Sequence, residues 1–311
     1  MPVEPTGVET AGRLATTRAR ANRLCRTGAI GERMRSPESD DRELRRPAKT
    51  DYVTGAHIRT GGPVTEAIDR YLDLAIKTIS NTIYGDANQK PWVPLVYDAA
   101  ARETGRDWPS QAHSMIGVQR LQNVRQLCER AIQEGVPGDF IETGIWRGGA
   151  CILMRAVLAA YGETGRNVWC CDSFEGLPLP DEASYPQDKD DQHHTYKELA
   201  VSLEMVQENF RKYDLLDDQV KWVKGFFEDT LDRIEAERFS VVRLDGDMYS
   251  STMVALETLY PKLTPGGFLI VDDYGAIPQC KQAIEDYRGR NGIADEIHDI
   301  DWTGVWWRKM A

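Results

Sequence analysis

The chain has 311 residues, of which 41% are hydrophobic and 28% charged, as expected for a globular protein with one large domain or a domain and an appendage. Its net charge of −11 is uneven, because residues 1–49 hold eleven Lys or Arg against seven Asp or Glu and the remainder holds 27 against 42. An acidic body lacks the basic face that nucleic acids and anionic membranes require, so neither is an expected partner.

Three absences narrow the class further. The sequence has no apolar run of about 18 residues that would predict a spanning helix, and its N-terminus carries no secretory signal pattern. The six cysteines are scattered and form no C-x-x-C pair, which argues against a structural zinc site and favours reduced thiols. We therefore expect a cytoplasmic protein.

The N-terminal part divides into two segments. Residues 1–60 are predicted to be a disordered or loosely structured extension, because they have few large apolar residues to bury. A short basic helix over 11–24 that docks on an acidic partner is the alternative, and a solvated tail is favoured. Helical apolar spacing over 64–83, and a second helix over 114–134, then predict a helical cap spanning residues 61–137.

Residues 138–311 alternate short apolar, β-branched runs with amphipathic stretches, which predicts a doubly wound, mostly parallel α/β sheet. A short connection between the last two strands predicts a closing antiparallel hairpin. The predicted strands are 139–143, 167–171, 219–224, 239–244, 267–271, 296–300 and 304–308, and the predicted helices are 149–161, 202–213, 251–261 and 279–288.

A glycine-rich turn follows the first of these strands, over residues 142–149. Its glycines let backbone N–H groups approach a ligand, and the next helix N-terminus favours an anionic group. The turn is not G-x-G-x-x-G, and the acidic Glu142 before it suits the ammonium group of S-adenosylmethionine better than a pyrophosphate. Tight packing between strand and helix is the alternative explanation of the glycines.

The second strand runs into Asp172, 28 residues after Gly144. An acid at this point reaches the hydroxyls of a ribose in nucleotide-binding sheets, whereas the alternative is a helix cap. Together with the glycine turn, the ribose role is favoured.

Two pairs of aspartates follow the fourth and fifth strands, Asp245 with Asp247 and Asp272 with Asp273. Either pair alone suits a turn, but the carboxyl ends of parallel strands meet at one edge of a sheet. Four clustered carboxylates repel one another unless a cation compensates them, and hard oxygen ligands suit Mg²⁺, Ca²⁺ or Mn²⁺. A metal site is therefore predicted at this edge.

A polar stretch over residues 181–198 is too long for an ordinary connection, and such insertions often form lids over substrates. His193 and His194 lie in it. A proton-transfer role for one of them is an option, and an exposed histidine without a special role is favoured.

Several motifs in this order resemble the macrocin O-methyltransferase family of metal-dependent sugar methyltransferases, which includes enzymes of the tylosin, mycinamicin and novobiocin pathways. The motifs are E-T-G-I-W-R-G-G, C-D-S-F-E-G-L-P, R-L-D-G-D-M-Y-S-S-T-M and G-G-F-L-I-V-D-D-Y, and the resemblance extends from about Tyr71 to Arg308. It implies a class I methyltransferase fold, a homo-oligomer, and methylation of a sugar hydroxyl on a macrolide- or aminocoumarin-type product. Another small glycoside or a glycolipid is the alternative acceptor.

The resemblance also implies roles for individual residues. Asp245, Asp272 and Asp273 are the implied ligands of Mg²⁺, and Asp247 is the implied general base. The implied acceptor contacts are Trp108 and Asp247, and His194 of the stretch 181–198 is a further expected acceptor contact that the resemblance does not supply. The expected contacts of S-adenosylmethionine are Met115, Ile116, Glu142, Thr143, Gly144, Arg147, Gly148, Asp172, Ser173, Gly225, Phe226 and Asp245. Gly225-Phe226-Phe227 departs from the family's usual G-W-F at this point.

These roles combine into an in-line methyl transfer in which Mg²⁺ orients the acceptor and Asp247 takes its proton. A nucleotide-dependent reductase on a similar sheet is the rival enzyme, and the missing G-x-G-x-x-G argues against it. A binding module that has kept the fold is the non-enzymatic rival, but such a module would not need all of these acidic residues.

Overall fold

The computed structural model describes residues 63–90 and 94–310. The predicted extension over residues 1–60 lies outside the described residues. None of the helices within the described ranges is long and apolar enough to span a bilayer.

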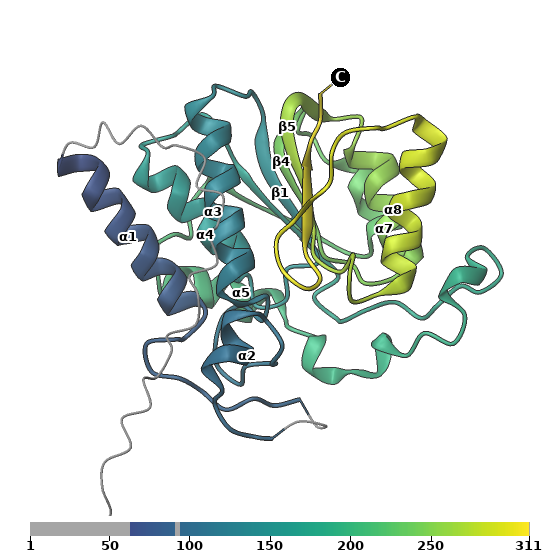
Figure 1. The fold of residues 1–311 in the computed structure, drawn as a ribbon, viewed down its shortest axis with the longest axis horizontal. Coiled ribbons are helices and arrows are strands. Elements are labelled where there is room, and N and C mark those ends of the chain that lie inside the picture. The colour runs from purple at the N-terminus through teal and green to yellow at the C-terminus, as the bar shows by residue number, and fades with distance from the viewer. Residues whose placement is uncertain (1–62, 91–93, 311) are drawn as a thin grey trace, which may run out of the picture. The chain divides into compact units, whose positions relative to one another are not determined.

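A seven-stranded sheet in the order β3-β2-β1-β4-β5-β7-β6 forms the middle layer of the fold (Figure 1). Strands β1 to β5 pair in parallel, and β7 is antiparallel to both β5 and β6. The predicted doubly wound sheet and its closing antiparallel hairpin are thereby confirmed. The strands are β1 Asp139–Thr143, β2 Val168–Asp172, β3 Val220–Lys224, β4 Phe239–Leu244, β5 Leu263–Val271, β6 His298–Asp299 and β7 Val305–Arg308.

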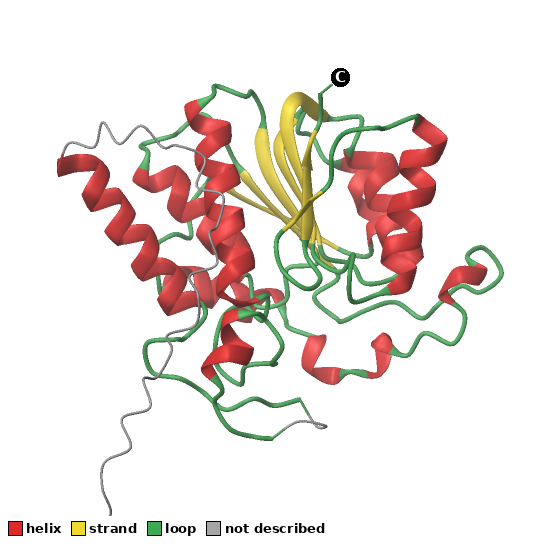
Figure 2. Ribbon diagram, viewed as in Figure 1, coloured by secondary structure: helices red, strands yellow, loops and turns green. Residues whose placement is uncertain are grey.

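Helices cover both faces of this sheet (Figure 2). On one face α1, α3 and α4 pack together, and on the other α7 packs against α8. The α-helices are α1 Pro63–Ile79, α2 Ala99–Glu103, α3 Gly117–Gln133, α4 Gly149–Ala160, α5 Leu203–Arg211, α6 Phe227–Thr230, α7 Tyr249–Leu259 and α8 Pro278–Asn291, and the 3₁₀ turns are η1 Pro186–Asp188, η2 His193–Thr195, η3 Lys197–Leu199 and η4 Leu231–Arg233.

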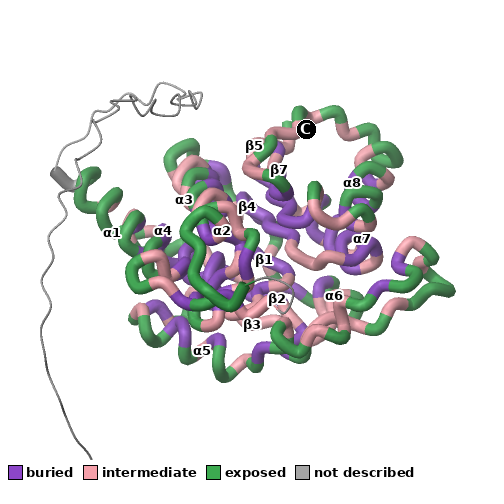
Figure 3. Tube along the Cα trace, turned by 60° about the horizontal axis from the view of Figure 1, so that its bottom comes forward, coloured by how far each residue is buried: buried purple, intermediate pink, exposed green. Residues whose placement is uncertain are grey.

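Successive side chains of a strand point to opposite faces of the sheet, so the apolar strands contribute to two cores, one on each face. Phe140 and Val241 belong to the core under α1, α3 and α4, whereas their neighbours Ile141 and Val242 belong to the core under α7 and α8. In Figure 3 the buried strands lie between these two helical layers. Helices α1 and α3 of the predicted cap thus contribute directly to one of the two cores of the sheet domain.

Element boundaries shift where the backbone leaves its regular conformation. Helix α1 ends at Ile79, before the predicted residue 83, because Asn81 adopts a left-handed φ of 50°. Helix α3 starts at Gly117, three residues after the predicted start, where φ is +81°. Strand β5 begins at Leu263, earlier than predicted, and pairs there with Phe239 across a register shift.

Candidate active site

A cavity of about 310 Å³ opens at the carboxyl ends of β1, β2, β4 and β5, the edge at which parallel sheets bind ligands. Most of the residues singled out from the sequence line it. They are Trp108, Met115, Ile116, Glu142, Gly144, Asp172, Ser173, Phe226, Asp245, Asp247, Asp272 and Asp273. Five others, Thr143, Arg147, Gly148, Gly225 and His194, do not line the cavity.

The glycine turn after β1 is built by close backbone contact. Gly144 has a φ of +80°, and a Cβ there would lie 1.7 Å from the carbonyl oxygen of Asp245, so only glycine fits. The carboxylate of Asp172 accepts the N–H groups of Ile145 at 2.8 Å and Phe174 at 2.7 Å. Asp172 therefore ties the glycine turn to the end of β2 as well as facing the cavity.

Three of the predicted residues that do not line the cavity belong to the backbone segments around it. The Arg147 guanidinium donates to the backbone carbonyls of Pro109 at 3.2 Å and Ala112 at 3.0 Å, which holds the loop after Trp108. Thr143 is buried within β1, and Gly225 has a φ of +140° in the turn before Phe226.

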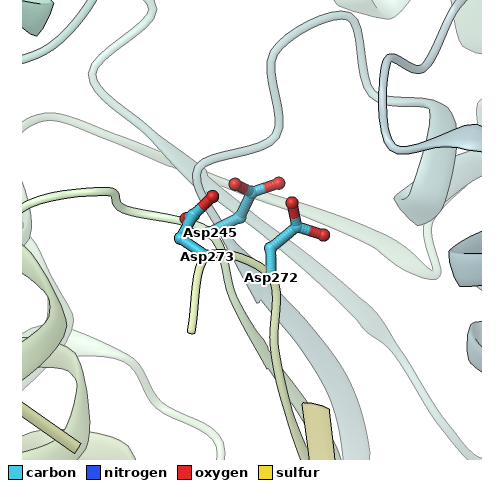
Figure 4. A group of neighbouring side chains, drawn as sticks. All are labelled: Asp245, Asp272 and Asp273. Carbon is cyan, nitrogen blue, oxygen red and sulfur yellow. The ribbon is translucent and has the colours of Figure 1, made fainter. Parts of the chain in front are cut away.

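Three carboxylates project together from the ends of β4 and β5 (Figure 4). One oxygen from each of Asp245, Asp272 and Asp273 lies within 4.8 Å of the others. Burial, and then the neighbouring carboxylates, raise the pKa of both Asp245 and Asp273 well above its ordinary value. The raised pKa values show that these carboxylates repel one another, which is the arrangement that a bound cation would relieve.

Asp247 lies beside this cluster in a strained conformation, with a φ of 57° that places its side chain in the same cavity. Its N–H donates to Asp273 at 3.3 Å. Burial raises the pKa of Asp247, and the nearby His193 counteracts part of that rise.

Two buried arginines, neither of them singled out from the sequence, compensate part of this charge. Arg243, in the middle of the sheet on β4, donates from one nitrogen to both Glu142 and Asp245, the latter at 2.7 Å, and from the other to Asp272. Arg120 on α3 donates to the second oxygen of Asp272. A charged residue inside the apolar run Phe239–Leu244 was a signal for Arg243, because a fully buried cation requires anionic partners.

The polar stretch over 181–198 is tied to the catalytic edge at several points. Asp188 is fully buried and accepts the N–H groups of Tyr249 at 2.7 Å and Ser250 at 2.9 Å. Trp146 of the glycine turn donates from Nε1 to the carbonyl of Glu198 at 2.8 Å. The stretch therefore forms part of the cavity wall.

An aromatic contact joins the stretch 181–198 to the loop that contains Trp108. The rings of Trp108 and Tyr196 meet edge to face at 5.5 Å, and the Lys90 ammonium lies 5.1 Å from the Trp108 ring. On this wall His193, and not the predicted His194, lines the cavity.

The strand order, with its antiparallel β7 beside β5, is the sheet of a class I methyltransferase. A solved structure of the O-methyltransferase NovP superposes with a TM-score of 0.76 at 47% identity, covering 78% of this chain and all of that one. The calicheamicin methyltransferase CalS11 shares the fold, with a TM-score of 0.52 at 17% identity over 83% of this chain and 99% of its own.

The chain belongs to the macrocin-O-methyltransferase (TylF) family, whose model matches residues 69–309. A rhamnosyl-tetracenomycin C 4'-O-methyltransferase from Streptomyces olivaceus is 52% identical over 79% of this chain and 95% of its own length. Mycinamicin III 3''-O-methyltransferase from Micromonospora griseorubida is 48% identical over 78% of this chain and 98% of its own. Membership confirms the resemblance inferred from the motifs and sets aside the reductase and the binding module.

Proposed function

We propose that the chain transfers the methyl group of S-adenosylmethionine to a sugar hydroxyl of a glycosylated natural product, with Mg²⁺ as its metal. The observation that carries the proposal is the meeting, in one cavity, of the Asp245, Asp272 and Asp273 cluster with the glycine turn. The relatives act on rhamnosyl-tetracenomycin, mycinamicin and novobiocin compounds, which supports a glycosylated natural product as acceptor and includes the macrolide and aminocoumarin types.

The cofactor side of the cavity fits S-adenosylmethionine. Gly144 leaves room for backbone approach, and Asp172 and Ser173 present oxygens at the end of β2. Glu142, only 2% exposed, contributes negative charge at the floor. Met115, Ile116 and Phe226 add apolar wall, while Thr143, Arg147, Gly148 and Gly225 shape the surrounding backbone. The cofactor supplies the methyl group, and these residues orient it and exclude water.

The three-carboxylate cluster fits a hard divalent cation. Six acidic side chains interact here, namely Glu142, the four aspartates and Asp301, against Arg120 and Arg243. With all of them ionised, negative charge remains in excess, which favours the binding of a divalent cation and a sulfonium. Bound Mg²⁺ supplies Lewis-acid polarisation of an acceptor hydroxyl.

Asp247 is the proposed general base, two residues beyond Asp245. It faces the cavity beside the cluster, and its backbone is held by the N–H···O contact to Asp273. Its carboxylate accepts the proton that the acceptor hydroxyl loses as the new O–CH₃ bond forms. Trp108, which lines the same cavity, is the proposed aromatic contact of the acceptor sugar.

The test is a panel of glycosides incubated with the full chain, S-adenosylmethionine and Mg²⁺, with products identified by mass spectrometry. One added methyl group on the sugar is expected, whereas methylation of only the aglycone, or of no glycoside, would overturn the proposal. A glycolipid or another small glycoside as sole acceptor would redefine the substrate class.

The metal and the base are tested separately. A chelator is expected to abolish turnover and Mg²⁺ to restore it, and full activity in chelator would remove the metal from the proposal. Asp247→Asn is expected to lower kcat about 10²-fold or more while leaving cofactor and metal affinities unchanged. The exposed Asp218→Asn is the matched control. Near-normal turnover of D247N would exclude Asp247 as the base.

We propose further that the chain works as a homo-oligomer whose contact includes the helical segment 61–137. Large apolar side chains stay exposed on α1 and the following loop, among them Leu74, Tyr84, Leu95 and Val96. Apolar groups gathered on one segment favour association between copies. Light scattering is expected to show a dimer or tetramer, and a monomer at micromolar concentration would contradict this. Deleting residues 1–60 tests whether the extension contributes.

A further inference from the structure

The polar stretch 181–198 is fixed next to Asp247 by a buried helix cap. Asp188 accepts the first two N–H groups of α7, from Tyr249 and Ser250, and α7 begins two residues after Asp247. A buried carboxylate at these donors satisfies groups that have no partner within the helix. The residues that follow Asp188 are therefore placed at the edge of the cavity on which Asp247 lies.

Asp191 and His193, three and five residues further on, form a carboxylate–imidazole pair. The Asp191 side chain is 3% exposed, and its Oδ2 lies 2.7 Å from Nδ1 of His193. Its other oxygen accepts the backbone N–H of His193 at 2.9 Å. A carboxylate partner requires Nδ1 to carry a proton, so in the neutral ring Nε2 is the nitrogen with a free lone pair.

The imidazole is also held from the side. The ring of Tyr196 meets it edge to face at 5.9 Å, and Tyr196 in turn contacts Trp108. Within the described residues no hydrogen bond to Nε2 is formed. His193 lines the cavity together with Asp247, whereas the next residue, His194, lies outside it. The imidazole is thus held in one orientation in the lining of the cavity that also contains Asp247.

We infer that His193 is an acceptor-binding residue whose Nε2 forms a hydrogen bond with a sugar hydroxyl other than the one that is methylated. Asp191 is its positioning residue. The inference rests on the proposed function, because it requires a polyhydroxylated acceptor. It assigns recognition of a second hydroxyl to the wall formed by residues 181–198.

The test uses His193→Phe, which keeps a ring of similar size and removes Nε2, with Lys197→Met as the control at an exposed position of the same stretch outside the cavity. His193→Phe is expected to raise the acceptor KM about tenfold, as for the loss of one hydrogen bond in a binding site, and to leave the cofactor and Mg²⁺ affinities measured by calorimetry unchanged. Lys197→Met is expected to leave the acceptor KM unchanged. An acceptor KM for H193F within twofold of the wild type would overturn the inference, as would a loss in kcat alone.

Two further measurements separate recognition from a structural role. Acceptor analogues that each lack one hydroxyl should include one for which the wild type and H193F have equal KM, because that analogue lacks the partner of Nε2. Asp191→Asn is expected to raise the acceptor KM in the wild type and to have no further effect in H193F. Additive effects of the two substitutions, or a KM gap that persists with every analogue, would contradict the pairing.

If H193F does not fold, His193→Gln and Asp191→Asn are compared instead. Glutamine retains a side-chain oxygen that can form the hydrogen bond, so H193Q is expected to have an acceptor KM closer to the wild-type value than D191N has. The reverse order would overturn the inference. Failure of the proposed function is recognised separately, because then the wild type itself methylates no glycoside.

Discussion

The most demanding prediction concerns Arg243, the buried cation at the centre of the carboxylate network. Its guanidinium is fully buried on β4 and bridges Glu142, Asp245 and Asp272. Arg243→Met keeps an unbranched apolar stem, ends short of the guanidinium position, and removes the charge and the five donors. The three carboxylates then lose a shared partner, and Glu142 retains the Cys151 thiol at 2.9 Å.

The magnitude follows from the cost of leaving buried charges unpaired. Removing one partner of a buried ion pair costs about 3–5 kcal/mol of unfolding free energy. The Nε of Arg243 has no partner among the described residues, so its removal offsets about 1 kcal/mol of that cost. We expect a net loss of about 3 kcal/mol, a large part of the roughly 5–15 kcal/mol that stabilises a typical domain.

The assay is urea unfolding followed by circular dichroism in the absence of metal. Arg211→Met is the matched control, because Arg211 pairs with Glu208 and both side chains are more than half exposed, so its loss should cost less than about 1 kcal/mol. Arg243→Lys keeps the charge without the two-armed geometry and should fall between them. A loss for R243M no larger than for R211M would refute the assignment of Arg243 as the cation that stabilises this network.

Three other predictions follow from local geometry. Gly144→Ala should cost at least about 3 kcal/mol in urea unfolding, because its Cβ would overlap the Asp245 carbonyl, whereas Gly162→Ala, also at positive φ but in open space, should cost only about 1 kcal/mol; equal losses would contradict the close-contact argument. Asp273→Asn should weaken Mg²⁺ binding at least about tenfold by calorimetry, and unchanged affinity would remove it from the ligand set. Burial, with Lys212 and Arg147, lowers the pKa of His113 to about 4, so the unfolded chain takes up a proton below about pH 6.5 that the folded chain refuses. Between pH 6.5 and pH 4.5 the unfolding free energy should therefore fall by about 2 kcal/mol more in the wild type than in His113→Gln. An equal fall in the two proteins would contradict the lowered pKa of His113.

Much of the fold was predictable because the strands are buried on both sides. Near-continuous apolar runs such as Phe239–Leu244 leave few alternatives to a central parallel strand. Helix α6 and the 3₁₀ turns escaped prediction because one turn carries too little periodicity. Helix α2 had one usable signal, since Asp98 precedes three alanines and its side chain accepts the N–H groups of Ala100 and Ala101.

The site residues that follow strands were also predictable from the sequence, whereas those in loops were not. Asp245 and Asp272 follow adjacent parallel strands, so strand order alone brings them together, and electroneutrality would have added Arg243. The choice between His193 and His194 had no such basis, because the stretch 181–198 has no strand or long helix to impose a period. That choice is made by Asp188, whose cap on α7 fixes the register of the stretch, and by Asp191, whose carboxylate selects the imidazole two residues later. A sequence argument could have reached His193 only by treating Asp191 and His193 as a unit, which the adjacent pair of histidines obscured.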